Sequence, residues 1–278
     1  MFFSSIVYYL IIKKAQINKI DNRLYMVVNF SIPAFLFLFF NIKKGLDIFI
    51  HPLSIFYIFI ASFIFSYIGS VISYIAINKA PNAGYSLVIQ KSYAIFTSIA
   101  AIYLFQSSLP LIKFMAILLI VVSTGAISIT RGKKLNFKNY LWVIYSVISF
   151  FCFGGISLFN KYMVTKGIPP TVVLFWTMVF VSSISIINLI KNGINIAFHP
   201  TLGNWLTLFG IGFSVTFFYY FKIISEVTAP NIGFVNAINT ASNAFYTVLV
   251  AFIFKDHLSW KKFMAVLGVT FGLILLVV

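Results

Sequence analysis

The sequence predicts an all-α polytopic membrane protein, with about ten transmembrane helices arranged as two inverted five-helix repeats. Composition is the first observation: of 278 residues, 61% are hydrophobic and only 9% are charged, whereas soluble domains carry about 25% charged residues. The second is that apolar stretches of about 20 residues, the length that crosses a bilayer, recur along the whole chain. The third is an internal repeat.

The repeat is an ungapped match between residues 80–129 and residues 229–278. Both copies open with APN-x-G, at Ala80 and Ala229, and both contain K-F-M-A, at Lys113 and Lys262. Self-similarity at a fixed offset indicates two copies of one structural unit. We expect a first repeat over 1–130 with a short first helix, a basic linker over 131–139, and a second repeat over 140–278.

Ten segments are expected to form the helices. The first, 1–12, is apolar but short for a bilayer, and it spans only if the helix continues toward Ile20. Pro33 is expected to kink the second helix. The remaining segments are 24–41, 53–78, 84–105, 111–129, 140–161, 171–190, 202–224, 233–254 and 260–278. Five helices per repeat make the second copy enter the membrane from the opposite side, a plan that recurs in secondary transporters.

The net charge of +16 does not indicate nucleic-acid binding. The basic residues sit in short breaks between apolar runs, where they meet lipid headgroups and set orientation. Cys152 is the only cysteine, which excludes an internal disulfide and a cysteine metal site. No P-loop, H-E-x-x-H or G-x-S-x-G motif is present. We therefore expect no enzyme, no cofactor and no metal. The expected partners are a small-molecule solute and the lipid bilayer, for a monomer or homodimer.

Lys91 is the exception to the clean predicted spans, because it lies about two turns into the fourth helix. A charge at that depth is costly unless it is paired or hydrated. It can snorkel to the surface, pair with helix C-terminal carbonyls, or face a watery cavity and bind an anion. Intramembrane ionisable residues are functional by default, which favours the cavity.

The ninth helix carries a polar stripe. Asn236, Asn239, Asn243 and Tyr246 follow i, i+3, i+7 and i+10, which places them on one narrow face. Their equivalents in the fourth helix include Gln90 and Thr97. The alternative is interhelical hydrogen bonding, because amides also join membrane helices. Three asparagines on one face favour a cavity lining.

Aromatic walls are expected from Trp176 in the seventh helix and Tyr219 in the eighth. Small residues indicate close packing, above all Gly268-x-x-x-Gly272 against the fifth helix at Ser123. The predicted substrate-binding residues are Lys91, Gln90, Thr97, Asn236, Asn239, Asn243, Tyr246, Trp176 and Tyr219.

The chain resembles the drug/metabolite transporter superfamily, in its ten-helix EamA-type branch. The APN-x-G starts carry this resemblance, together with a short loop similar to Leu-Gly-Glu-x-Leu-Ser/Thr. The second copy of that loop reads Phe254-Lys-Asp-His-Leu-Ser259, and the first reads Phe105-Gln-Ser-Ser-Leu-Pro110, without the acid. The resemblance implies a ten-helix fold and transport of small organic solutes.

The chain has four acidic residues, and none lies mid-span: Asp21, Asp47, Glu226 and Asp256. Related small multidrug exporters use a glutamate in their first helix, so proton-coupled export of lipophilic cations is disfavoured. Glu226 is expected to pair with Lys222, one turn back.

The excess of Lys and Arg in the odd-numbered loops predicts external termini for ten spans, whereas the resemblance implies cytoplasmic termini. A nine-span chain whose first segment does not cross, with a cytoplasmic N-terminus, obeys the charge rule.

The sequence thus predicts a multi-pass protein of the cytoplasmic membrane. Its expected function is secondary transport of a small polar metabolite, an amino acid or other small organic anion, by alternating access. The alternatives are a flippase for lipid-linked substrates, a multidrug exporter, an assembly protein and an intramembrane enzyme. Substrate, direction and coupling ion stay open.

Overall fold

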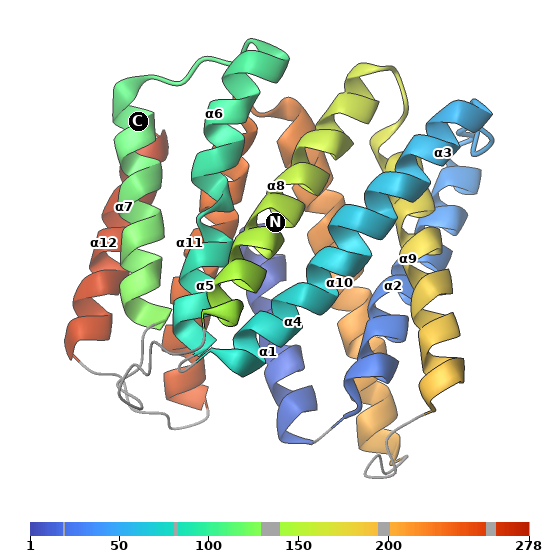
Figure 1. The fold of residues 1–278 in the computed structure, drawn as a ribbon, viewed down its shortest axis with the longest axis horizontal. Coiled ribbons are helices and arrows are strands. Elements are labelled where there is room, and N and C mark those ends of the chain that lie inside the picture. Colours follow the sequence, from blue (N-terminus) through green and yellow to red (C-terminus); the bar gives the residue numbers. More distant parts are fainter. Residues whose placement is uncertain (19, 81–82, 129–139, 194–200, 254–259, 278) are drawn as a thin grey trace. The chain divides into compact units, whose positions relative to one another are not determined.

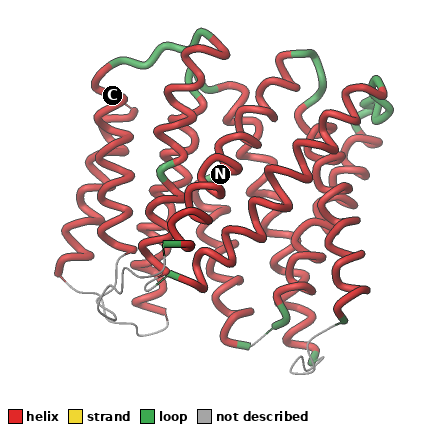
Figure 2. Tube along the Cα trace, viewed as in Figure 1, coloured by secondary structure: helices red, strands yellow, loops and turns green. Residues whose placement is uncertain are grey.

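The computed structural model describes the whole chain except residues 19, 81–82, 129–139, 194–200, 254–259 and 278. All regular elements of the described residues are helices (Figures 1 and 2). They are α1 (Phe2–Ile17), α2 (Asn22–Lys43), α3 (Pro52–Ala61), η1 (Ser62–Ile68), α4 (Gly69–Lys79), α5 (Ala83–Lys91), α6 (Tyr93–Phe105), α7 (Leu111–Ser128), α8 (Leu141–Thr165), α9 (Pro170–Asn192), α10 (Leu202–Thr228), α11 (Ile232–Ile253) and α12 (Trp260–Val277).

These elements confirm the predicted all-helical membrane fold. Because α3, η1 and α4 follow one another directly and α5 and α6 are separated by one residue, the described elements correspond to the ten predicted segments. By length and composition, six helices of the described residues can cross a membrane. α1 continues past Lys13 and Lys14 and ends at Ile17, which is beyond the end of the apolar stretch 1–12. The linker and the Asp256 loop lie outside the described residues.

Two predicted spans are interrupted, which the apolar pattern did not indicate. The third contains a π-helical segment, Ser62–Ile68. The fourth is divided at Ser92 into α5 and α6, although the Ser92 N–H still makes the helical i→i−4 bond to the Val88 carbonyl (3.1 Å), beside a bond to the Ile89 carbonyl (3.3 Å). Both π-helical segments and broken helices are frequent where membrane transporters bind ligands.

The chain forms two compact units. Unit 1 contains residues 1–63 and 160–227, and unit 2 contains residues 64–159 and 228–278. Each unit therefore combines segments from both halves of the sequence. The repeat boundaries concern sequence equivalence rather than contact, and they stay a prediction.

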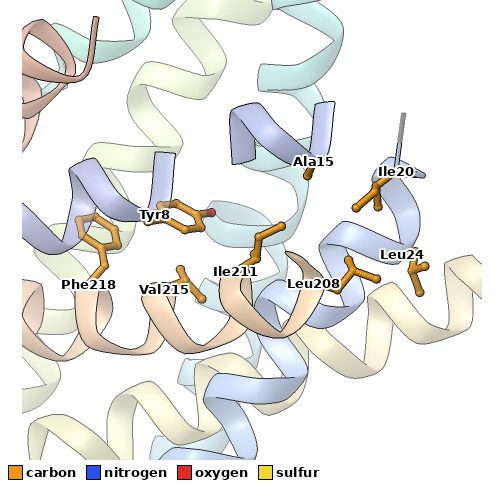
Figure 3. Close-up of a cluster of buried hydrophobic side chains, with 8 residues drawn as sticks. All are labelled: Tyr8, Ala15, Ile20, Leu24, Leu208, Ile211, Val215 and Phe218. Carbon is orange, nitrogen blue, oxygen red and sulfur yellow. The ribbon is translucent and has the colours of Figure 1, made fainter. Parts of the chain in front are cut away.

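In unit 1, α2 packs along α9, and α1 packs on α10. Figure 3 shows the cluster between α1 and α10, in which Tyr8 stacks on Phe218 with ring centroids 6.0 Å apart. Gly212 of α10 faces Ile32 of α2, and a Cβ at Gly212 would lie 2.6 Å from the Ile32 Cβ. The small residue lets these two helices approach closely.

In unit 2, α7 packs along α12, and α11 packs on α6 and α7. A Cβ at Gly268 would lie 2.5 Å from the Ser123 Oγ, and one at Gly272 would lie 2.7 Å from the Ile120 Cγ1. The predicted packing of Gly268-x-x-x-Gly272 against the fifth helix at Ser123 is confirmed.

α6 ends on a residue in the left-handed conformation. Gln106 has φ 52° and ψ 33°, and its N–H bonds the Ala101 carbonyl. Glycine usually occupies this position because a Cβ is unfavourable there. Gln106 stands where the loop of the resembled family has its glycine.

Large apolar side chains remain exposed on outward helix faces. On α10, Phe209, Phe213 and Phe217 lie four residues apart and are 58%, 53% and 53% exposed. A soluble protein rarely exposes such a stripe, whereas lipid solvates it. The face fits a helix inside a bilayer.

Candidate functional site

The APN-x-G start of α11 docks onto α6 within unit 2. Asn231 is fully buried, and its Nδ2 donates to the Ser98 carbonyl (3.1 Å). Its Oδ1 accepts the N–H of Gly233 (2.8 Å), satisfying one of the free donors at the helix start. A Cβ at Gly233 would lie 2.6 Å from the Ser98 Cα. The motif therefore caps α11 and brings it close to α6.

Asn236 joins three helices of unit 2. Its Nδ2 donates to the Thr97 Oγ1 of α6 (3.0 Å) and to the Ser157 Oγ of α8 (3.1 Å). Ser157 donates back to the Asn236 Oδ1 (3.3 Å). All three residues are fully buried. The bonds of Asn236 and Thr97 match the hydrogen-bonding alternative of the sequence analysis.

Asn239, one turn further along α11, differs from Asn236. Its Nδ2 donates to the Tyr93 hydroxyl of α6 (3.1 Å). Its Oδ1 is buried and has no hydrogen-bond partner among the described residues. A buried acceptor without a partner is costly, so this oxygen is suited to a donor from outside the chain.

Gln90 joins α5 to α4 and, through Ser86, to α8. Its Oε1 accepts from the Ser73 hydroxyl (2.7 Å), and its Nε2 donates to the Ser86 Oγ (2.9 Å). Ser86 bonds Ser146 of α8 (2.7 Å). Gln90 is 1% exposed. Its amide thus holds the half-helix α5 in place.

Lys91 is the last residue of α5, at the break before α6. The Thr240 hydroxyl of α11 donates to its backbone carbonyl (3.4 Å) and to the Asn236 carbonyl (2.9 Å). The Lys91 side chain is half-buried, as are Asn243 and Tyr246. The ammonium therefore starts from the C-terminal end of α5, where a cation is favoured.

The two predicted aromatic walls belong to unit 1. The Trp176 Nε1 donates to the Ile48 carbonyl (3.0 Å), which anchors the segment between α2 and α3. Trp176 also stacks on Phe180 at 5.6 Å. Tyr219 of α10 interacts with the Asn29 side chain and with Lys222. The predicted Lys222–Glu226 pair is confirmed, with the Nζ 3.4 Å from the Oε1.

Five of the nine predicted residues take part in hydrogen bonds that link α4, α5, α6, α8 and α11 within unit 2. These five residues, called the polar layer below, are Gln90, Lys91, Thr97, Asn236 and Asn239. Asn243 and Tyr246 lie on α11 of the same unit. Sequence reasoning missed Tyr93 and Thr240. Thr240 is the repeat equivalent of Lys91, and Tyr93 lies one turn after Gln90. The sequence therefore contained a pattern that pointed to each of these two residues. No group of three or more metal-ligating side chains occurs among the described residues.

The fold defines a multi-pass integral membrane protein. The model of the EamA-like transporter family matches residues 140–278, half of the chain. The protein belongs to the EamA-like transporter family. This confirms the resemblance to the drug/metabolite transporter superfamily.

Two further comparisons concern the whole chain. A solved structure described only as "Crystal structure of protein" matches with a TM-score of 0.81 and 12% sequence identity, covering 99% of this chain and 95% of that chain. This likeness shows the fold alone. No curated protein matches the sequence.

Proposed function

We propose that the protein is a secondary transporter of the cytoplasmic membrane that moves a small polar metabolite with an anionic group. An amino acid fits best, because it brings both a carboxylate for Lys91 and an ammonium donor for a carbonyl acceptor. The transport step is alternating access, with no covalent chemistry and no nucleotide.

The observation that carries the proposal is the Asn239 Oδ1, a buried acceptor without a partner among the described residues. It lies one residue from Thr240, which bonds the backbone at the helix break. Transporters commonly build substrate sites from the ends of discontinuous helices. Lys91 at such an end supplies a positive charge, and Asn239 supplies an acceptor.

The way in which the antiparallel helix pairs α5–α6/α11 and α7/α12 are aligned supports an inverted repeat. At the repeat offset of 149, Lys91 is equivalent to Thr240, and these two residues are hydrogen-bonded to each other. On α7 and α12, Ile120 is equivalent to Val269, between the Gly268 and Gly272 contacts. Contacts between equivalent positions of antiparallel helices are expected where a pseudo-two-fold axis passes.

A flippase for lipid-linked substrates is the second candidate. The exposed phenylalanine face of α10 would suit contact with lipid tails, but nothing in the described polar layer selects a lipid-linked sugar. A multidrug exporter is less favoured, because the polar layer carries a lysine rather than a mid-span carboxylate for cations.

A ligand screen by thermal shift tests the proposal. Detergent-purified protein is heated with amino acids, small carboxylates, sugar phosphates and organic cations, since a binder raises the melting temperature by mass action. We expect stabilisation by one class of amino acid or organic anion, lost in Lys91→Ala and weakened in Asn239→Leu. Lys44→Ala, at the exposed end of α2, is the matched control. Stabilisation by cations alone, or an unchanged response in Lys91→Ala, contradicts the proposal.

A further inference from the structure

The open acceptor of Asn239 has a hydrogen-bond donor beside it. The Asn239 Nδ2 donates to the Tyr93 hydroxyl (3.1 Å), so the hydrogen of this bond belongs to the amide and the hydroxyl hydrogen of Tyr93 is not used in it. Asn239 and Tyr93 are each 3% exposed. The Asn239 Oδ1 has no hydrogen-bond partner among the described residues. One buried contact between α6 and α11 therefore holds an acceptor and a donor next to each other.

This pair lies at the junction of α5 and α6. Tyr93 is the first residue of α6, and Lys91 is the last residue of α5. Two consecutive residues of α11 bond the junction: Asn239 bonds the Tyr93 hydroxyl, and Thr240 bonds the Lys91 carbonyl (3.4 Å). The Tyr93 ring packs edge to face against Phe153 of α8, with ring centroids 6.5 Å apart. The acceptor and the donor are thus held beside the residue that supplies the positive charge of the proposed site.

Asn236, one turn earlier on α11, shows how the same helix satisfies an asparagine completely. Its Nδ2 donates to Thr97 and Ser157, and its Oδ1 accepts from Ser157. A buried acceptor without a donor destabilises a fold, so the contrast with Asn239 favours a donor that comes from a ligand. The reverse orientation of the Asn239 amide would instead leave Nδ2 open and would select an acceptor, an alternative that the experiment below separates.

We propose that Asn239 and Tyr93 recognise the amino group and the carboxylate of an α-amino acid, so that the amine is required for tight binding. The Asn239 Oδ1 accepts a hydrogen bond from the ammonium group of the ligand, and the Tyr93 hydroxyl donates to a carboxylate oxygen. An α-amino acid carries these two groups on one carbon atom, which suits an acceptor and a donor in direct contact. The inference rests on the proposed function and narrows its substrate class, because carboxylates and sugar phosphates without an amine lack the donor for Oδ1.

Matched ligand series test the inference on the full-length protein in detergent. Each series compares an amino acid with the acid that lacks its α-amine and with the amine that lacks its α-carboxylate. The series are phenylalanine, phenylpropanoate and phenylethylamine; leucine, isocaproate and isoamylamine; alanine, propanoate and ethylamine; and glutamate, glutarate and aminobutyrate. Thermal-shift titrations give the affinity of each ligand, since a binder stabilises the protein by mass action. We expect an amino acid that stabilises wild type to bind about tenfold tighter, or more, than either of its analogues, as a hydrogen bond to a charged group supplies.

Variants decide whether this pair is responsible. Asn239→Leu removes the acceptor, so the amino acid and the acid without the amine should bind with similar affinity. Asn239→Asp keeps an oxygen in place of Oδ1 and should retain the preference for the amine, whereas the reverse amide orientation predicts its loss. Tyr93→Phe should weaken binding of the amino acid but not of the plain amine. Asn192→Leu and Tyr103→Phe, on exposed residues of α9 and α6, are the matched controls and should keep the wild-type affinity ratios.

Several results overturn the inference and leave transport of an organic anion standing. They are equal binding of an amino acid and its amine-free acid in wild type, an amine preference that survives Asn239→Leu, and an amine preference that is lost in Asn239→Asp. A merely structural role would lower stability in the variants without changing these ratios. The wild-type ligand series needs no variant, so it decides the question even where a variant does not fold. Stabilisation by none of the amino acids and acids, or by amines alone, contradicts the proposed function itself.

Discussion

The Thr240 hydroxyl donates a hydrogen bond to the backbone carbonyl of Lys91, 3.4 Å away. The two residues are equivalent positions of the internal repeat, 149 residues apart. Lys91 is the last residue of α5, immediately before Ser92. The contact therefore joins the junction of α5 and α6 to the polar face of α11.

Thr240→Val tests the importance of this contact. Val keeps the shape of the side chain but loses the hydroxyl that bonds both α11 and Lys91. We expect a loss of about 1 kcal/mol in stability and weaker solute binding, measured by thermal unfolding with and without ligand. Thr216→Val is the control, because its hydroxyl bonds the Gly212 carbonyl of its own helix. Equal effects of the two variants on ligand binding would contradict a special role for Thr240.

Asn236 and Asn239 are expected to respond differently. Asn236→Leu breaks bonds to Thr97 and Ser157 and leaves both fully buried hydroxyls with fewer partners. It should lower stability by about 1–2 kcal/mol. Asn239→Leu removes an acceptor without a partner in the described residues, so it should affect solute binding more than stability. Thermal unfolding and ligand titration of both variants give the comparison, and the reverse ranking would refute it.

The packing of α12 on α7 depends on the small residue at Gly268. Gly268→Ala places a Cβ 2.5 Å from the Ser123 Oγ and should cost about 1–3 kcal/mol. Adding Ser123→Ala removes that oxygen and should restore most of the loss. Gly203→Ala is the control, since its nearest neighbour would be 4.0 Å away. The experiment is a double-mutant cycle by thermal unfolding, and additive losses would show that this contact is not limiting.

Gln106 offers a stabilising substitution. Its φ of 52° is the left-handed conformation, which costs a residue with a Cβ about 1–2 kcal/mol. Gln106→Gly should therefore raise the melting temperature, after subtraction of the added freedom of the unfolded chain. Gln106→Ala keeps the Cβ and should give no gain. An equal gain for both would assign the effect to the glutamine side chain instead.

The sequence predicted the order of the helices closely, because apolar length and proline punctuation act locally. For example, α9 begins at Pro170 behind Pro169, as the double proline indicated. The break at Ser92 was missed because residues 84–105 are continuously compatible with a helix. The division of this span is associated with tertiary contacts, because residues of other helices form hydrogen bonds with the Gln90 side chain and with the Lys91 carbonyl.

Site residues were predicted where repeat and periodicity coincide, as for Asn236 and Asn239. The sequence could not show that Trp176 bonds the Ile48 carbonyl, 128 residues away, or that Asn236 bonds the Ser157 hydroxyl, 79 residues away. Both contacts depend on tertiary packing between segments distant along the chain, which no local pattern encodes.

Counterflow in proteoliposomes tests the central claim of secondary transport most directly. Vesicles of purified protein are preloaded with an unlabelled solute from the thermal-shift screen, and entry of the labelled solute is followed without nucleotide or imposed ion gradient. We predict saturable, transient accumulation in wild type and in Lys44→Ala, and loss of at least tenfold in rate in Lys91→Ala. Binding without any accumulation in wild type, or full accumulation in Lys91→Ala, would contradict the account.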